Sequence, residues 1–174
     1  WSRLVVIALM GAAWFVLFPS YMSLGIALLL LAGWATAWDL LGGWTGQTSL
    51  GHAAFVGLGA YTIGSTANKF DLAPWWAALL AMALAAALSF VWGKLTFRLR
   101  GSYFVLASIA IAEILRLVAI NERSLTGGAV GLFIFDLKEP FGVDLFNRGN
   151  EFCISLGYLL LVMAVTVLVS RRRL

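Results

Sequence analysis

The side chains best able to do chemistry lie between residues 42 and 64, a stretch that stands out in an apolar chain. It contains seven glycines, the only histidine of the chain, His52, and the polar step Gln47-Thr48-Ser49. A single histidine with no cysteine at ligand spacing argues against a metal site. Walker A, GxSxG and HExxH motifs are absent from the sequence, so it offers no catalytic residues of those classes. We therefore expect these polar groups to bind or to pack, and not to catalyse.

One face of the segment after residue 49 combines polar and small side chains. A helix over residues 50–66 places side chains three and four apart on the same side. That face carries Ser49, His52, Val56, Gly59 and Ile63, with Phe55 beside it. Two interpretations stay open. The glycine allows close helix packing with His52 as a buried hydrogen-bonding group, or the face borders a polar path across a membrane.

The glycines around Gln47 predict a break in the helix before this face. A break at residues 47–51 would expose backbone amides at the start of the next helix, and broken helices of this kind direct partial positive charge at substrate carboxylates. Glycines also make ordinary turns. The 42–49 link is therefore either a loop at the membrane surface or an unwound segment buried in the bundle.

Glu113 and Arg116 form the second polar feature, inside an otherwise apolar run. On a helix, residues three apart share a face, and pairing lowers the cost of placing ionised groups in a membrane. A purely structural ion pair is one interpretation. A gating or subunit-interface contact is the other.

Membrane helices are the elements that must position these residues. The chain has 174 residues, of which 62% are hydrophobic and 11% charged, with a mean hydropathy of +0.95; this is too apolar for a soluble domain. The long apolar segments of the chain must be helical, because lipid cannot hydrogen-bond to the backbone. We predict an all-α, polytopic membrane helix bundle with about six transmembrane helices in a single domain, 1–174. The predicted spans are 4–18, 22–41, 50–66, 75–93, 102–120 and 152–170.

The distribution of basic residues predicts the orientation. If the chain crosses the membrane six times, seven of its twelve Lys and Arg residues fall on the same side of the membrane. They lie at position 3, between 94 and 100 and at 171–173. The loop 121–151 falls on the other side and contains five of the eight acids. Because cytoplasmic loops carry the excess of Lys and Arg, both termini are expected to be cytoplasmic and the 121–151 loop periplasmic.

Three stretches, in order, resemble the motifs of one family: TGQTSLGHAAFVGLGAYT, RLRGSYFVLASIAIAEILRLV and RSLTGGAVGL. They are similar to the permease subunits of bacterial ABC importers for branched-chain amino acids, in particular the LivM-type subunit. The resemblance implies a multi-pass protein of the bacterial inner membrane. Family members continue into a cytoplasmic loop that docks on the ATPase, so we expect this chain to be the N-terminal portion of such a permease.

The same resemblance implies a transport subunit that is not an enzyme and carries no cofactor of its own. ATP and Mg are expected on two partner ATPase subunits, beside a second permease subunit that completes a heterodimer. A periplasmic substrate-binding protein would deliver leucine, isoleucine or valine and dock near a periplasmic turn at Thr126, Gly127 and Gly128. Three rivals stay open: a permease of the same family for urea or short amides, an ion-coupled secondary transporter, and a purely structural membrane subunit. Candidates for the translocation pathway or for helix packing are Gln47, Ser49, His52, Phe55 and Gly59.

Overall fold

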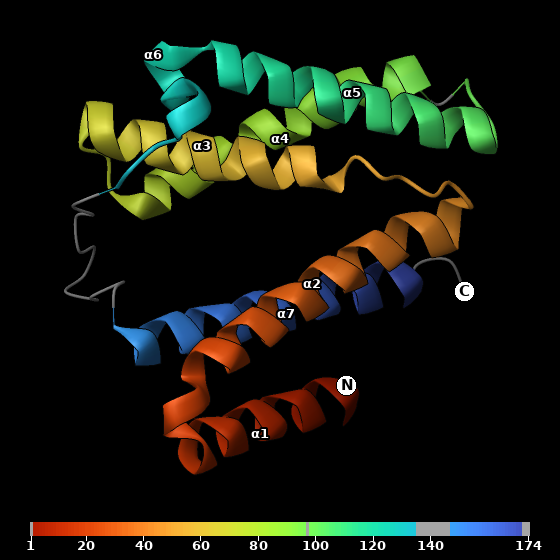
Figure 1. Cartoon of the computed structure of the whole chain (residues 1–174). Coiled ribbons are helices and arrows are strands. Elements are labelled where there is room, and N and C mark those ends of the chain that lie inside the picture. Colours follow the sequence, from red (N-terminus) through yellow and green to blue (C-terminus); the bar gives the residue numbers. More distant parts are fainter. Residues whose placement is uncertain (1, 97, 135–146, 172–174) are drawn as a thin grey trace. The chain divides into compact units, whose positions relative to one another are not determined.

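The computed structural model describes residues 2–96, 98–134 and 147–171. Every regular element in this part of the chain is a helix (Figure 1), which confirms the all-α prediction there. In chain order the elements are α1 (Ser2–Leu17), the 3-10 turn η1 (Pro19–Tyr21), α2 (Met22–Thr45), α3 (His52–Phe70), α4 (Pro74–Thr96), α5 (Ser102–Asn121), α6 (Arg123–Thr126), the 3-10 turn η2 (Gly128–Val130) and α7 (Arg148–Arg171).

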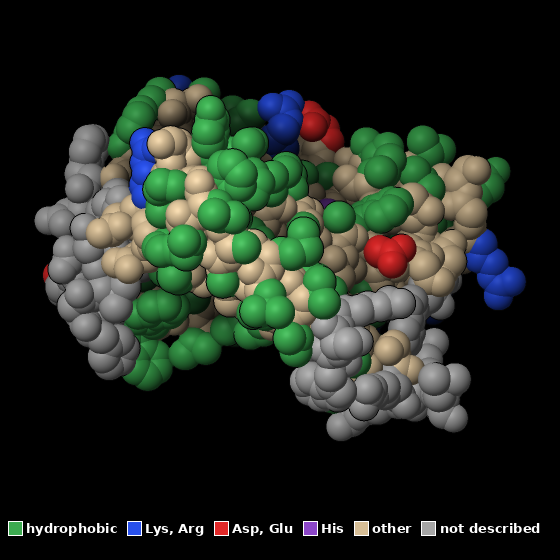
Figure 2. Space-filling view, turned by 90° about the horizontal axis from the view of Figure 1, so that it is seen from below, with side chains coloured by type: hydrophobic (Ala, Val, Ile, Leu, Met, Phe, Trp, Pro, Cys, Tyr) green, Lys and Arg blue, Asp and Glu red, His purple; other side chains and the backbone are tan. Residues whose placement is uncertain are grey.

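Four helices among the described residues are long and apolar enough to cross a bilayer. They cover Pro19–Gly43, Pro74–Thr96, Ser102–Asn121 and Arg148–Ser170. Large apolar side chains point outward from them and from α1, and Figure 2 shows hydrophobic side chains spread over the viewed face with charged ones sparse between them. Such a surface suits lipid and not water, so the chain is a multi-pass helical membrane protein. The count of six spans stays a prediction, because α1 is shorter and α3 more polar than these four helices.

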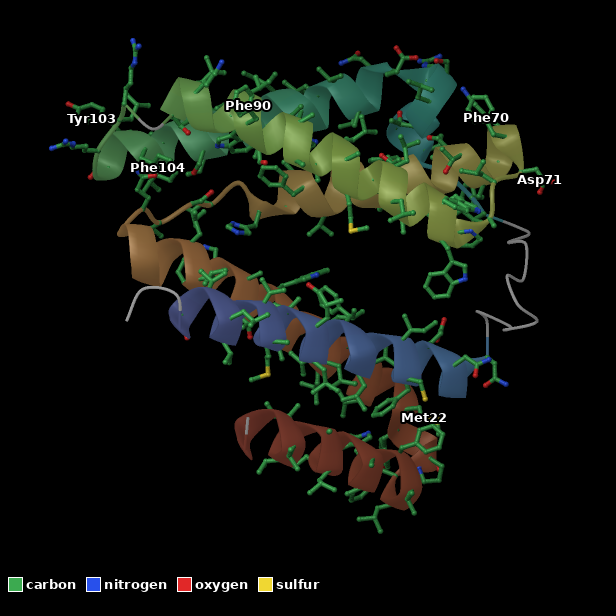
Figure 3. The ribbon with its side chains drawn as sticks, turned by 180° about the vertical axis from the view of Figure 1, so that it is seen from behind. Met22, Phe70, Asp71, Phe90, Tyr103 and Phe104 are labelled. Atoms are coloured by element: carbon green, nitrogen blue, oxygen red, sulfur yellow. The ribbon has the colours of Figure 1, made fainter. Side chains whose placement is uncertain are left out.

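Proline and a left-handed residue set the helix ends. The residue before a proline is disfavoured in helical conformation, and Phe18 accordingly leaves α1 with φ −129° and ψ 57° before Pro19. Pro74 begins α4, because the first helical position needs no backbone N–H. Asp71 closes α3 in a left-handed conformation, φ 50°, just after Phe70 (Figure 3).

The chain forms two compact units. The first comprises residues 1–44 and 143–174, and glycines bring its helices together. A Cβ at Gly33 of α2 would lie 2.3 Å from the ring of Tyr158 of α7. A Cβ at Gly11 of α1 would lie 2.7 Å from Leu156, which also belongs to α7. Missing side chains thus let large neighbours approach the backbone, as is usual between membrane helices.

The second unit comprises residues 45–142, and α3 packs against both α4 and α5 within it. Its interior is built from a few large side chains that the helices bury, above all Trp92 of α4 and Phe104 of α5. Tyr103, the neighbour of Phe104, is 73% exposed where Phe104 is 2% exposed, and Figure 3 shows the two rings leaving α5 in different directions. The side of α5 that faces the interior of the unit is therefore already defined in the first turn of the helix.

Candidate functional site

The predicted helix break is present. Helix α2 ends at Thr45 and α3 begins at His52, and Gly46 between them has φ +66°. Two backbone amides at the break are held by hydroxyl groups: the Leu50 N–H donates to Ser108 Oγ at 3.0 Å, and the Gly51 N–H donates to Ser49 Oγ at 3.3 Å. Because Ser108 belongs to α5 and is fully buried, the break is fastened to the interior of the second unit.

The start of α3 also lies unusually close to α4. A Cβ at Gly51 would lie 2.4 Å and 2.5 Å from Cζ2 and Cη2 of Trp92, and 3.0 Å from the backbone oxygen of Ser108. The rings of Phe55 and Trp92 pack with centroids 5.2 Å apart. No residue with a side chain fits at position 51 without displacing a buried indole. The sequence placed Gly51 at the end of the predicted break, but nothing in it indicated the close contact with Trp92.

The predicted polar face of α3 is mostly open within its unit. Ser49 is buried and His52 half-buried, but Val56 is 40% exposed and a Cβ at Gly59 would meet no described atom within 4 Å. The Nδ1 atom of His52 is buried and makes no hydrogen bond to a described residue. Helix packing and a polar path therefore both remain open for this face.

Other positions of α3 are the buried ones. Thr62 and Thr66 are buried, and each hydroxyl donates to the backbone carbonyl four residues earlier, at 2.7 Å. With Gly51 and Phe55 they follow 4,7,4 spacing, which puts them on one side of the helix, toward α4. Phe55, at the edge of the predicted face, takes part in this packing. Gln47 lies half-buried in the link before α3.

A groove lies on the opposite side of α3 from the predicted face. It has a volume of about 710 Å³ and runs between α3 and α5, with residues of α6 among its lining. Small and apolar side chains of α3 form one wall, and the apolar side chains of α5 form the other. The α3 wall consists of Leu50, Ala53, Ala54, Gly57, Leu58 and Tyr61. This wall was not predicted from the sequence, although its alanines and glycine recur at helical spacing.

The Glu113–Arg116 pair lines this groove. Arg116 Nη2 lies 2.6 Å from Glu113 Oε1, and Arg116 Nε donates to Glu113 Oε2 at 2.8 Å. The predicted pairing is therefore present as a two-point contact. The side chains keep 59% (Arg116) and 50% (Glu113) of their surface exposed, so both charges remain accessible from the groove.

The predicted outer turn follows α6. Gly127 and Gly128 have φ of +74° and +65°, a region that favours glycine, and the Gly128 N–H donates to Thr126 Oγ1 at 3.2 Å. Ser65 of α3 donates to the backbone oxygen of Leu125 at 2.5 Å. The turn is therefore held against α3. The later part of the predicted periplasmic loop, residues 135–146, lies outside the described residues.

In the described part of the chain, no group of three His, Cys, Asp or Glu side chains is placed to hold a metal ion. Two polar features near α3 and α5 have capacity for a further hydrogen bond: the His52 imidazole and the Glu113–Arg116 ion pair. Such groups can bind a polar ligand by hydrogen bonds and charge.

Comparison with known proteins matches residues 18–174 to the family model described as "Branched-chain amino acid transport system / permease component". The high-affinity branched-chain amino acid transport system permease protein LivM of Escherichia coli K12 is 30% identical over 109 residues, which cover 63% of this chain and 26% of the relative. LivM of Salmonella typhimurium LT2 is 31% identical over 109 residues, which cover 63% of this chain and 25% of that relative. The matches thus span about a quarter of the length of these relatives. No solved structure matches the chain.

Proposed function

Because the chain belongs to the family of permease components of branched-chain amino acid transport systems, we propose that it forms part of the translocation pathway of an ATP-driven ABC importer for leucine, isoleucine and valine. The family match over residues 18–174 is the observation that carries this proposal. The apolar helices and the broken connection between α2 and α3 support it, since transporters use interrupted helices at their binding sites.

The partners in this proposal follow from what such a cycle needs. The sequence contains no Walker A motif, so ATP and Mg would bind to two separate ATPase subunits. A second permease subunit would complete the pathway, and a periplasmic binding protein would deliver the amino acid. Six spans with both termini cytoplasmic would place the 121–151 loop on the periplasmic face of the bacterial inner membrane.

Reconstitution of the complete transport complex containing this chain tests the proposal. The complex is placed in proteoliposomes with the binding protein in the outer solution and with ATP enclosed on the side of the ATPase subunits. These proteoliposomes should accumulate radiolabelled leucine, and the uptake should stop when vanadate blocks ATP hydrolysis. Uptake driven by a proton or sodium gradient without ATP would contradict the proposal and favour a secondary transporter. Uptake of urea or acetamide in place of leucine would show a permease for short amides.

Substitution of His52, at the start of α3, distinguishes a role of this face in the translocation pathway from a purely structural role. We expect His52→Leu to lower leucine uptake several-fold while the complex still assembles, because loss of the imidazole removes a polar group from a membrane site. Val56→Leu, on the same face of α3, is the matched control and should leave uptake near the parent value. Equal uptake by the His52 variant and the parent would favour a structural role for this face.

A further inference from the structure

The Glu113–Arg116 pair lies far from both ends of an apolar helix. Glu113 is about 16 Å along α5 from Ser102 and about 12 Å from Asn121, at about 1.5 Å per residue. Ionised side chains at such depth in a membrane face protein or water, since lipid cannot solvate them. The pair must therefore meet a polar group or an aqueous space on its exposed side.

The groove supplies that space in a form that suits a small ligand. Its volume of about 710 Å³ falls within the range of roughly 300–1,000 Å³ that is usual for ligand pockets. Small residues of α3 line the same groove as the pair, and a Cβ at Gly57 would meet no described atom within 4 Å. A mostly apolar wall facing one charged pair is the arrangement that binds a ligand with an apolar body and a charged head.

The hydrogen-bonding capacity that Glu113 and Arg116 have left over indicates which charged group the ligand must carry. A guanidinium has five N–H donors, and Glu113 engages Arg116 through Nε and Nη2. The outer donors of Arg116 can take a carboxylate, while further lone pairs of Glu113 can take an ammonium. A ligand carrying both charges matches the pair and keeps the groove neutral. An apolar helix or lipid chain in the same place would leave the outer donors of Arg116 and the further lone pairs of Glu113 without partners.

From this arrangement we infer that the α3–α5 groove binds a free α-amino acid, with Arg116 holding the carboxylate, Glu113 holding the ammonium and the apolar side chain lying against Ala53, Ala54 and Gly57. The inference rests on the proposed function. It assigns the two charged residues to substrate recognition.

Equilibrium binding to the complete transport complex, purified without its binding protein, tests this assignment. Tritiated leucine is the probe, and leucinamide, which lacks the carboxylate, and 4-methylpentanoate, which lacks the amine, are the competitors. We expect each competitor to bind at least about tenfold more weakly than leucine, because each loses a charged hydrogen-bonding group. Arg116→Gln should abolish the preference for leucine over leucinamide, and Glu113→Gln should abolish the preference over 4-methylpentanoate.

Two further variants separate recognition from structure. The charge-swapped variant Glu113→Arg/Arg116→Glu keeps an ion pair on α5 but reverses the sites, so it should lose leucine binding by about tenfold or more. Gly57→Leu should fill the groove and weaken binding, whereas Ala83→Leu, at an exposed position of α4 that does not line the groove, should not. If Arg116→Gln fails to assemble, Arg116→Lys replaces it, since lysine keeps the charge and loses the two-point geometry.

The outcomes distinguish this inference from the proposed function. Parental selectivity in the assembled single variants, or full leucine affinity in the charge-swapped variant, would overturn the inference. So would a parent complex that binds no leucine at millimolar concentration while its ATP-driven leucine uptake continues, and in that case the proposed function would stand. A parent complex that neither binds nor transports leucine would overturn both.

Discussion

Replacing Gly51 by alanine is the sharpest test of how α3 is held. The new Cβ would lie 2.4 Å and 2.5 Å from two ring carbons of Trp92 and 3.0 Å from the backbone oxygen of Ser108. Carbon atoms pack best at about 3.5–4.0 Å, so the overlap exceeds about 1 Å. The indole is 6% exposed and packed on Phe55, and a carbonyl cannot swing aside. Overpacking of this kind costs about 1–3 kcal/mol.

Backbone conformation adds nothing to this value. Gly51 has φ −90°, which alanine adopts readily, so any loss of stability comes from the steric contact alone. The assay is unfolding of the purified permease in mixed micelles of rising SDS fraction, which yields a free energy of unfolding for each variant. Gly59→Ala is the matched control: its Cβ meets no described atom within 4 Å, and alanine is favoured over glycine in a helix by about 0.5–1 kcal/mol.

A double-mutant cycle identifies the contact itself. Trp92→Leu removes the ring that the new methyl group strikes, so Gly51→Ala should cost less in that background than in the parent, and the difference measures the coupling between the two positions. Parental stability in the Gly51→Ala variant would refute the reasoning. An equal loss in Gly59→Ala would show that glycines of α3 matter for a reason other than Trp92.

Two more predictions concern other contacts that hold the helices. Ser108→Ala removes the acceptor of the Leu50 N–H and should lower the free energy of unfolding by about 1 kcal/mol in the same assay; Ser89→Ala, an exposed serine that bonds only its own helix in the described structure, should leave it nearly unchanged and serves as control. Gly33→Ala drives a Cβ to 2.3 Å from the ring of Tyr158 and should destabilise the first unit by about 1–3 kcal/mol, a prediction that unchanged unfolding would contradict.

Local features of the structure were readable from residue types. Pro74 begins a helix because its ring fixes φ and its missing N–H is not needed there. The run of glycine and polar residues before His52 does interrupt the helix. Glu113 and Arg116 pair because three residues bring side chains to one helical face. Each of these depends on neighbours within about one turn, which the sequence alone specifies.

The faces of α3 were harder to predict, because periodicity sorts side chains into faces without naming the neighbour of each face. From the sequence, the face with His52 and Gly59 could be either a helix-packing surface or the border of a polar path, and the opposite face received no prediction. In the structure the groove lies on the other side, and Thr62 and Thr66 belong to the buried side. Alanine and glycine are ordinary in membrane helices, so nothing in the sequence distinguishes the groove wall from a packing surface.

The sequence by itself determined that this chain is helical and built for a membrane, because apolar runs of such length leave the backbone no other way to satisfy its hydrogen bonds. It also indicated a helix break near Gln47 and the ion pair on α5. Only the tertiary structure decided that the amide of Leu50 is held by Ser108, 58 residues away in the chain, and that the ion pair opens into a groove beside α3. Those features depend on which helices pack together, and that choice is made by the fit of side chains far apart in sequence.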